Sequence, residues 1–415
     1  MKVLHLLSGE LTGGAARGAY WLHKAQTKIG IDSQLFIDSN ANYNEANIHS
    51  NIKNTDKVFR LIRPRLDKIP NRLFNHQSSL YSYNIIGKDI INTELYKNAD
   101  IIHLHWINNG FLSLSQINKI NKPIVWTLRD MWPFTGGCHY SMTCKRYQIG
   151  CGNCPYLKGD FLYDSSFFIN KYKRKLAEKK DITVVGISSW ISQCARESVI
   201  FKNSRIETIG NTIDTDIFKP SNKELAKKIL GLENTKIISF GAQFISDNYK
   251  GMDELLAALK IAYKKGSFHL LVFGHIDVCI LKELNIPYTY FGFIQDNLSL
   301  NLIYSASDVF VAPSKMEAFG KTIAESMSCG TPVVAFDYSG PKDIITHYQS
   351  GYLAKPYMVE DLAYGIVYIL NLDKEKYTLM SKKSRDRVIN LFSPEITAKM
   401  YKTLYNEILC NSESL

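Results

Sequence analysis

Two glutamates, Glu317 and Glu325, lie eight residues apart in the sequence Glu-Ala-Phe-Gly-Lys-Thr-Ile-Ala-Glu. The apolar run 308–312 before them predicts a buried parallel strand, and residues 321–328 predict a helix that ends at Gly330. Ligands of doubly wound sheets bind at strand-to-helix edges of this kind, where helix amides bind phosphate oxygens. A fixed carboxylate accepts hydrogen bonds from two vicinal hydroxyls. The stretch therefore predicts a site for a ligand that has both phosphate and hydroxyl groups.

Two further loops have the composition of anion-binding turns. Lys250 precedes Gly251 in the loop after the predicted strand 236–240, and a lysine just before a helix binds phosphate as a point charge. The early loop contains Gly13 and Gly14, and small residues let backbone amides approach a ligand closely. A tight turn without a ligand explains the early loop equally simply, and the dinucleotide fingerprint G-x-G-x-x-G is absent.

Polar residues also follow two predicted strands of the N-terminal half. His103 and His105 lie on one face of the strand around 100–104, near its carboxyl end. There they can bind hydroxyls or move protons, or they are simply buried and hydrogen-bonded. Arg129 follows the strand 123–128 and can hold a phosphate or carboxylate with its planar fork; the alternative is a structural pair with Asp130.

Four cysteines lie within seventeen residues: Cys138, Cys144, Cys151 and Cys154. The last two have the Cys-x-x-Cys spacing of zinc sites, and thiolates held this closely suit tetrahedral Zn²⁺. We expect a structural zinc ion that fixes the loop. Buried free thiols and a redox pair are the alternatives.

Strands and helices alternate along both halves of the chain, which predicts an α/β protein with two parallel sheets. We expect an N-terminal domain at 1–210, a C-terminal domain at 211–392, and a closing helix, 393–415, that packs back on the first domain. Further strands are expected near the N-terminus and at the following ranges: 34–37, 182–187, 269–273, 289–291 and 332–336. Further helices are expected at 251–263 and 298–306.

Composition excludes some classes of protein. The chain has 415 residues, of which 45% are hydrophobic and 21% are charged, as in ordinary globular proteins with two domains. The sequence contains no run of eighteen apolar residues, so we expect no membrane-spanning helix. The first residues predict a strand rather than a signal peptide, so we expect a cytoplasmic protein. The net charge of +11 predicts anionic partners.

The basic charge is concentrated in two segments. Residues 57–74 alternate bases with large apolar side chains, which is typical of an interfacial segment on an anionic membrane. The alternative is a surface helix that is broken at Pro64 and packed by Phe59, Leu61, Ile62 and Leu66. Residues 171–175 form a second basic run, for which a solvated helix face is the simpler interpretation.

These motifs together resemble the retaining glycosyltransferases of family 4, which have the GT-B fold of two Rossmann-like domains facing each other across a cleft. The resemblance covers almost the whole chain and is strongest from 236 to 355. The sequences His-Leu-His-Trp at 103–106 and Trp-Thr-Leu-Arg-Asp-Met-Trp-Pro-Phe-Thr-Gly-Gly-Cys at 126–138 are similar to a branch associated with assembly of bacterial capsule, exopolysaccharide and lipopolysaccharide.

The resemblance implies a metal-independent hexosyltransferase, with a UDP- or GDP-sugar donor in the second domain and an acceptor in the first. Glu325 would hold the ribose, and Glu317 would contact the donor sugar together with the backbone of Ala318, Phe319 and Gly320. Lys250, assisted by Thr322, would hold the pyrophosphate. Donor contacts are also expected at Gly13 and Gly14. The acceptor would be a growing glycan or a lipid-pyrophosphate-linked glycan at the inner face of the cell membrane, where the protein would be peripheral.

Two positions depart from the family pattern. Many relatives have Gly-Arg where this chain has Gly241-Ala242-Gln243, so one phosphate-binding cation is missing. Many also have a histidine at the position of Arg129, so either Arg129 takes that role or His103 or His105 does. Competing interpretations are a sugar-nucleotide epimerase of the same fold and a basic nucleic-acid-binding protein. The chain lacks the aromatic platforms and helix-turn-helix signals that nucleic-acid binding requires.

Overall fold

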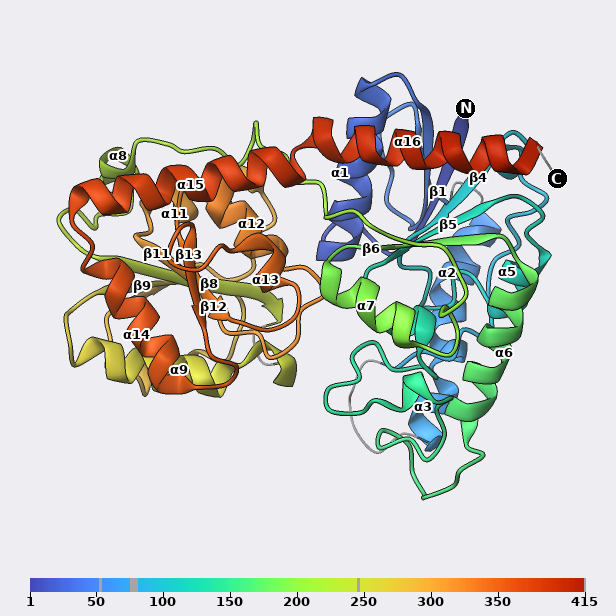
Figure 1. The fold of residues 1–415 in the computed structure, drawn as a ribbon, viewed down its shortest axis with the longest axis horizontal. Coiled ribbons are helices and arrows are strands. Elements are labelled where there is room, and N and C mark those ends of the chain that lie inside the picture. The colour runs from blue at the N-terminus through green and yellow to red at the C-terminus, as the bar shows by residue number, and fades with distance from the viewer. Residues whose placement is uncertain (52–53, 75–80, 245–246, 414–415) are drawn as a thin grey trace. The chain divides into compact units, whose positions relative to one another are not determined.

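The structure is a computed structural model, and it describes residues 1–51, 54–74, 81–244 and 247–413. The chain divides into two compact units (Figure 1). Unit 1 consists of Met1–Gly210 together with Thr397–Leu415, and unit 2 consists of Asn211–Ile396. The last helix therefore belongs almost wholly to unit 1, although it is far from the rest of that unit in sequence.

Unit 1 contains a seven-stranded sheet in the order β3-β2-β1-β4-β5-β6-β7, and its paired strands are parallel. The strands are β1 (Lys2–Ser8), β2 (Asp32–Asp38), β3 (Ile48–His49), β4 (Ile101–Leu104), β5 (Ile124–Leu128), β6 (Ile182–Gly186) and β7 (Ile206–Thr208). The helices are α1 (Gly14–Lys28), α2 (Asn54–Asp67), α3 (Ile69–Phe74), α4 (Glu94–Lys97), α5 (Leu114–Lys119), η1 (Trp132–Phe134), η2 (Arg146–Gln148), α6 (Ser165–Lys179), α7 (Ser189–Glu197) and α16 (Pro394–Glu413).

One face of this sheet is covered by α1 and α16, which lie against each other and the strands (Figure 1). Alternate residues of β1, β4 and β5 point to this face, because successive strand side chains alternate between faces. Val3, Ile101 and Val125 pack there against Tyr401, Tyr405 and neighbouring apolar residues of the two helices. The same alternation brings His5 and His103, which are paired in register on adjacent strands, to this face.

Unit 2 contains a six-stranded sheet in the order β10-β9-β8-β11-β12-β13, also with parallel pairings. The strands are β8 (Ile237–Phe244), β9 (His269–His275), β10 (Tyr288–Tyr290), β11 (Val309–Ala312), β12 (Val333–Phe336) and β13 (Gly351–Ala354). The helices are α8 (Lys223–Ile229), η3 (Asn248–Lys250), α9 (Met252–Tyr263), α10 (Val278–Lys282), α11 (Asn297–Ala306), α12 (Lys321–Ser328), α13 (Pro341–Ile344), α14 (Val359–Leu370) and α15 (Lys374–Phe392). Buried aliphatic side chains of α9 and α14 pack against the central strands. Both units therefore have the doubly wound α/β architecture that the alternating sequence pattern predicts.

The basic segment 57–74 differs from one of the two structures expected for it. Helix α2 continues through Pro64 as far as Asp67, so the expected break at Pro64 is wrong. The expected packing of Phe59, Leu61, Ile62 and Leu66 is also wrong, because their exposed fractions lie between 39% and 59%. Among the helices of the described residues, none combines the length and hydrophobicity that spanning a bilayer requires.

The second basic run, on α6, is only partly a solvated face. Lys171, Arg174 and Lys175 are exposed, but Lys173 is 2% exposed. Its ammonium group lies over the Trp132 ring, 3.6 Å from the centroid, and donates to the carbonyls of Trp132 (2.5 Å) and Thr135 (3.1 Å). Burial lowers the pKa of Lys173 to about 7. A residue expected at the surface thus fixes the loop that follows β5.

Candidate functional site

Each sheet has one place where the strand order reverses. In unit 1 the chain adds β2 and β3 on one side of β1 and then places β4 on the other side; in unit 2 the reversal lies between β8 and β11. Loops that leave the carboxyl ends of such strand pairs diverge and leave a crevice in which ligands of doubly wound sheets bind. The loops after these strands are therefore the candidate site of each unit.

In unit 2 the loops after β8 and β11 meet through their backbones. The amide of Lys315 donates to the carbonyl of Tyr249 (2.8 Å). Gly251 has φ +70°, and a Cβ there would lie 2.0 Å from the Pro313 carbonyl oxygen, so only glycine permits this approach. As a result, the Lys250 ammonium donates to Glu317 Oε2 at 2.6 Å, although the two residues are 67 positions apart.

The start of α12 presents backbone amides beside this ion pair. Its N-cap residue is Gly320, with φ +108°, and no side chain caps the helix. Ala318 and Phe319 are each 2% exposed, which fixes the backbone just before the helix. An uncapped helix start attracts anions, because its first amides have no intrahelical acceptors. Lys250, Glu317, Gly320 and Thr322 are thus assembled around one loop.

Glu325 lies one turn into α12 and is almost fully buried. Its side chain is 3% exposed, Oε1 lies 2.8 Å from the Lys321 ammonium, and Oε2 accepts from the Tyr304 hydroxyl at 3.2 Å. The carboxylate is therefore held in one orientation by a cation and a hydroxyl. Its contact with a ribose stays a prediction.

In unit 1 the predicted catalytic residues belong to a buried hydrogen-bonded network. His103 is 0% exposed and His105 is 2% exposed, and both lie beside His5, which the sequence analysis did not single out. Arg129, 8% exposed, donates from Nη2 to His105 Nδ1 at 3.0 Å. The structure therefore brings Arg129, His103 and His105 together, but it places both imidazoles in the interior.

The partners fix the direction of the hydrogen bonds. Gln26 donates its amide N–H to the Tyr405 hydroxyl (3.0 Å), so its oxygen accepts from His5 Nε2 (2.8 Å). His5 Nδ1 is then an acceptor and receives the proton of His105 Nε2 (2.9 Å), which leaves His105 Nδ1 to accept from Arg129.

The same logic continues to the C-terminal helix. The Tyr405 hydroxyl, which accepts from Gln26, donates to His103 Nδ1 (2.6 Å), and His103 Nε2 donates to the Thr127 hydroxyl (2.7 Å). Thr127 Oγ1 lies 2.9 Å from the Tyr401 hydroxyl. A single chain of hydrogen bonds, directed as far as Thr127, therefore joins the following residues in order: Arg129, His105, His5, Gln26, Tyr405, His103, Thr127 and Tyr401. We call it the histidine chain.

The histidine chain keeps its imidazoles neutral. Burial lowers the pKa of His5 to about 3 and holds the pKa values of His103 and His105 well below 6.5. Burial also lowers the pKa of Arg129 to about 10, which leaves its guanidinium charged at neutral pH. Among the described residues, His5, His103 and His105 form the only group of three or more metal-ligating side chains whose ligand atoms lie within 4.8 Å of one another. Each of their ring nitrogens already bonds a protein atom, so the group does not fit a metal ion.

Asp130 is not paired with Arg129 in the way the alternative interpretation supposed. Its Oδ2 accepts from His139 Nδ1 (2.6 Å) and from the Trp106 indole (3.1 Å), and its Oδ1 accepts from the Trp132 amide. His139 Nε2 lies 2.9 Å from Ser82 Oγ, so the three side chains have the order of a hydrolase triad. His139 is 0% exposed and Ser82 is 9% exposed, so we interpret these three side chains as a buried structural network.

The early glycine loop follows β1 at the unit 1 switch point. Gly13 is the N-cap of α1 and has no side-chain cap, and Gly14 is the first helical residue. A Cβ at Gly14 would meet no heavy atom within 4 Å, so the helix start is open on that side. The loop is anchored by a hydrogen bond from the Ser8 amide to the Trp106 carbonyl (2.7 Å).

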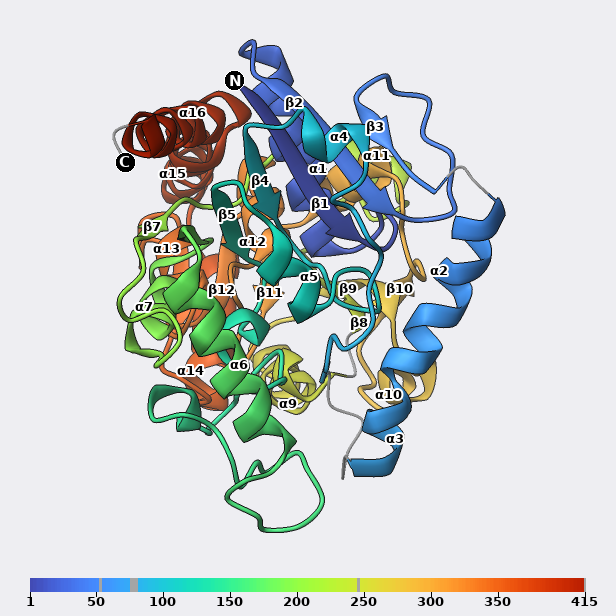
Figure 2. The ribbon, with the colours of Figure 1, turned by 90° about the vertical axis from the view of Figure 1, so that its right-hand side faces the viewer.

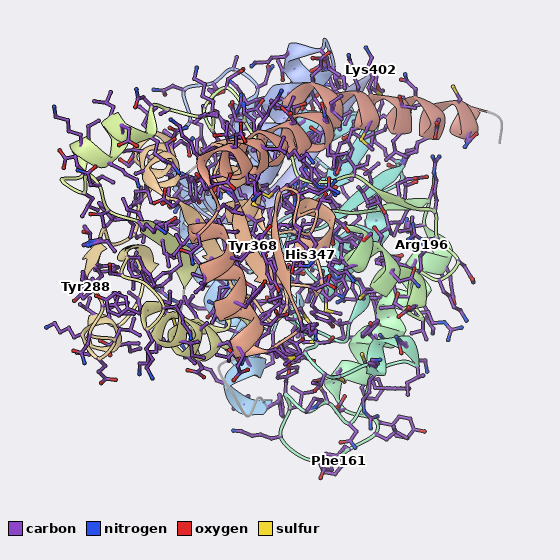
Figure 3. The ribbon with its side chains drawn as sticks, turned by 60° about the vertical axis from the view of Figure 1, so that its left-hand side comes forward. Phe161, Arg196, Tyr288, His347, Tyr368 and Lys402 are labelled. Carbon is purple, nitrogen blue, oxygen red and sulfur yellow. The ribbon has the colours of Figure 1, made fainter. Side chains whose placement is uncertain are left out.

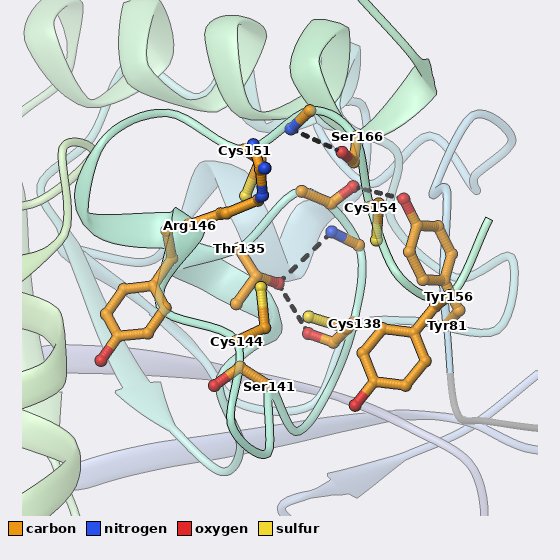
Figure 4. Close-up of a pocket in the computed structure, with 14 residues that line it drawn as sticks. Tyr81, Thr135, Cys138, Ser141, Cys144, Arg146, Cys151, Cys154, Tyr156 and Ser166 are labelled. Atoms are coloured by element: carbon orange, nitrogen blue, oxygen red, sulfur yellow. Dashed lines mark hydrogen bonds between the residues drawn. The ribbon is translucent and has the colours of Figure 1, made fainter. Parts of the chain in front are cut away.

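The four cysteines Cys138, Cys144, Cys151 and Cys154 line one cavity of about 20 Å³ (Figure 4). All four are free thiols. Burial and the neighbouring thiols raise the pKa of Cys151 to about 12, and burial raises the pKa of Cys154 to about 11. No three of their sulfurs all lie within 4.8 Å of one another, unlike the ligand atoms of the histidine group. Zinc at about 2.3 Å from each sulfur would therefore draw the loop inward.

Several residues of these arrangements were not found from the sequence. Lys321 could have been noticed, because it stands four positions before Glu325 on the same helix face. His5 and Gln26 gave no local signal, since the strand register and the docking of α1 bring them into the histidine chain. Tyr401 and Tyr405 are between 274 and 379 positions from their partners.

Comparisons with known proteins agree with this organisation. A family model described as glycosyltransferase family 4 matches residues 12–217, and one described as glycosyl transferases group 1 matches residues 222–387. The chain is 32% identical over 192 residues to an uncharacterized glycosyltransferase of Haemophilus influenzae, over 45% of this chain and 51% of that protein. It thus spans about half the length of this relative. It is 22% identical over 369 residues to the putative colanic acid biosynthesis glycosyl transferase WcaC of Escherichia coli K12, over 83% of this chain and 85% of that protein.

Two solved structures share the fold. Sucrose-phosphate synthase from Thermosynechococcus elongatus has a TM-score of 0.71 at 21% identity, over 99% of this chain and 100% of that one. Anabaena HepE, solved in complex with UDP-glucose, has a TM-score of 0.63 at 17% identity, over 98% of this chain and 100% of that one.

Proposed function

The chain belongs to family 4 of the glycosyltransferases and has the GT-B fold, and from this premise we propose that it transfers a sugar from a UDP- or GDP-sugar to a glycan acceptor in bacterial surface polysaccharide biosynthesis. The acceptor is a growing glycan or a lipid-pyrophosphate-linked glycan. The observation that most supports a nucleotide-sugar donor is the ion pair between Lys250 and Glu317 beside the uncapped start of α12.

The unit 2 switch point has one group for each part of such a donor. Lys250 and the amides of α12, with Thr322, neutralise the diphosphate, and Glu325 accepts from the ribose hydroxyls. Glu317 then exchanges its bond to Lys250 for the hydroxyls of the sugar, next to the backbone of Ala318, Phe319 and Gly320. Because Gly241-Ala242-Gln243 stands where many relatives have Gly-Arg, Lys250 is the principal side-chain cation at the diphosphate in this proposal.

In unit 1 we assign the reaction role to Arg129 rather than to His103 or His105. Both histidines have their ring nitrogens committed inside the unit, so they act as positioning residues that orient Arg129. A guanidinium provides a fixed charge and a planar fork for sugar hydroxyls or diphosphate oxygens. Gly13 and Gly14 contribute backbone amides at the start of α1.

The reaction breaks the bond between the anomeric carbon and the diphosphate oxygen and forms a bond to an acceptor hydroxyl oxygen on the same face of the sugar. The hydroxyl proton leaves with the diphosphate. Charge builds on the diphosphate in an oxocarbenium-like transition state, so fixed cations there lower the barrier. The configuration of the anomeric carbon is retained.

We also propose that Cys138, Cys144, Cys151 and Cys154 bind a structural zinc ion, which would fix their loop in unit 1. Four thiols around one small cavity support this assignment. Elemental analysis should find about one zinc per chain, and Cys151→Ser should lose it whereas Cys279→Ser, at an exposed cysteine, should retain it. Metal-free wild-type protein with unchanged stability would contradict the assignment.

A donor screen tests the main proposal. The full chain is incubated with UDP- and GDP-sugars and lipid-linked acceptors, and release of the nucleoside diphosphate is measured. Turnover with one donor is expected, with retained configuration in the product by NMR. Absence of turnover, together with absence of any thermal shift by any donor, would contradict it.

A further inference from the structure

One end of unit 1 presents large apolar side chains from two segments that are distant in sequence. Leu73 and Phe74 at the end of α3 are 61% and 54% exposed, and Phe161, Leu162 and Tyr163 are 57% to 68% exposed. The Lys158 amide donates to the Phe74 carbonyl at 2.6 Å, which joins the two segments. Both lie at the same end of the unit in Figures 1 and 2, and Figure 3 labels Phe161 at that end. We call these five residues the apolar tip.

The loop 155–163 is fixed at its base. The Asn153 amide donates to the Phe161 carbonyl (2.9 Å), and the Cys154 amide donates to Asp164 Oδ2 (2.7 Å). Gly152 has φ +103°, and a Cβ there would lie 2.1 Å from the Leu162 carbonyl oxygen. The cysteine turn therefore supports the loop and holds its apolar side chains outward.

Helix α2 extends the same surface, with charged residues on its buried side and large apolar residues on its exposed side. Its buried side is charged: Arg63 donates to Asp38 Oδ1 (2.8 Å), and Asp67 accepts from the Ile85 amide (3.0 Å). Its exposed side contains Arg65 and five large apolar side chains: Val58, Phe59, Leu61, Ile62 and Leu66. A surface helix of a water-exposed domain normally has the opposite arrangement. An apolar outer face of this extent indicates a surface that meets another apolar phase.

The charged side chains around this apolar surface indicate which kind of apolar phase it meets. Residues 57–74 contain six basic side chains and one acidic side chain, Asp67, which is buried. Arg65, Lys68 and Arg72 are exposed, and none of the ion pairs found among the described residues includes them. Apolar side chains interleaved with bases are complementary to a bilayer with anionic headgroups.

We propose that α2, α3 and the loop 155–163 form one docking surface for an anionic lipid bilayer, into which the apolar tip inserts. Arg65, Lys68 and Arg72 contact the lipid phosphates. The proposal rests on the proposed function in one respect: a lipid-linked acceptor would be presented at such a surface. Docking itself needs neither donor nor acceptor, so it is measured separately from sugar transfer.

Vesicle co-sedimentation of the full chain tests the proposal. Vesicles of phosphatidylcholine alone are compared with vesicles that contain phosphatidylglycerol. Wild-type protein should bind the anionic vesicles at least about tenfold more tightly, and Arg65→Ala, Lys68→Ala and Arg72→Ala combined should remove most of this preference. Phe161→Ser, Leu162→Ser and Tyr163→Ser combined should weaken binding at least about tenfold. The matched control, Ile229→Ser with Leu298→Ser, removes two exposed apolar side chains from unit 2 and should bind as wild type does.

A second measurement distinguishes loss of membrane insertion from a folding defect. In Phe161→Trp the new indole should show a blue-shifted fluorescence on adding anionic vesicles, and unchanged emission would overturn insertion. Wild-type protein that ignores anionic vesicles would overturn the proposal, as would the two surface variants binding as tightly as wild type. Self-association that Phe161→Ser abolishes, without vesicle binding, would show that the surface is a protein interface instead.

Discussion

The two units have the same order of strands around their reversal points, but they place different chemistry there. In unit 2 the loops after β8 and β11 hold Lys250, Glu317 and an uncapped helix start, and the two side chains are about one-fifth exposed. In unit 1 the ends of β4 and β5 contribute His103, His105 and Arg129, which bond within a buried network that also includes His5, Thr127 and, from α16, Tyr405. The unit 2 arrangement suits ligand binding directly, whereas the unit 1 arrangement holds one cation, Arg129, in place.

The largest difference is expected from Lys250. Lys250→Ala removes the cation that bonds to Glu317, so at the proposed donor site it should weaken diphosphate binding and leave Glu317 without this bond. Turnover should fall about 100- to 1,000-fold, the usual loss when one transition-state electrostatic contact is removed. Steady-state kinetics of nucleoside diphosphate release measures it. Lys260→Ala, at an exposed lysine on α9, is the control, and an equal loss in both variants would contradict the assignment.

A smaller loss is expected from Arg129→Lys. Lysine keeps the charge but cannot reproduce the planar fork, so its bond to His105 and its bond to a ligand compete. We expect kcat to fall about tenfold with little change in the KM of the donor. A change in donor KM alone, with kcat unchanged, would show that Arg129 binds the donor rather than acting in the reaction.

Acid should destabilise unit 1 more than unit 2. The imidazoles of the histidine chain are neutral when folded, with the pKa of His5 at about 3, and return to about 6.5 on unfolding. Below about pH 6.5 the unfolded state therefore binds more protons, and each of the three histidines reduces the free energy of unfolding by about 1.4 kcal/mol per pH unit. Hydrogen exchange at pH 7 and pH 5 should show unit 1 losing protection first. Equal loss in both units would contradict this expectation.

The smallest effect is expected from Tyr405→Phe, which removes the hydroxyl between Gln26 and His103. Leaving those buried groups without a partner should cost about 1–3 kcal/mol of unfolding free energy. If the histidine chain positions Arg129, kcat should also fall about threefold, with donor KM unchanged. Lys402→Ala, at an exposed position of α16, is the control. Lower stability with wild-type kcat would limit the chain to a structural role.

The sequence predicted much of unit 2 and less of unit 1, for physical reasons. The strand 308–312 and the helix 321–328 are confirmed almost to the residue, because an apolar run, a glycine and a proline define them locally. Short edge strands such as β3, with two residues, have no periodicity to detect. The sequence indicated that His103 and His105 share a face, but their burial follows from the docking of α16, which pairs residues about 300 positions apart. The Lys250–Glu317 contact likewise depends on a backbone hydrogen bond between two loops that are distant in sequence.

The central claim is that unit 2 alone contains the principal cation for the donor diphosphate, while Arg129 in unit 1 acts in the reaction. Calorimetric titration with UDP and GDP tests it on wild type, Lys250→Ala and Arg129→Ala. We expect one of the two diphosphates to bind wild type and Arg129→Ala with similar affinity, and to bind Lys250→Ala at least about tenfold more weakly. Undiminished binding to Lys250→Ala, or loss of binding only in Arg129→Ala, would contradict the account.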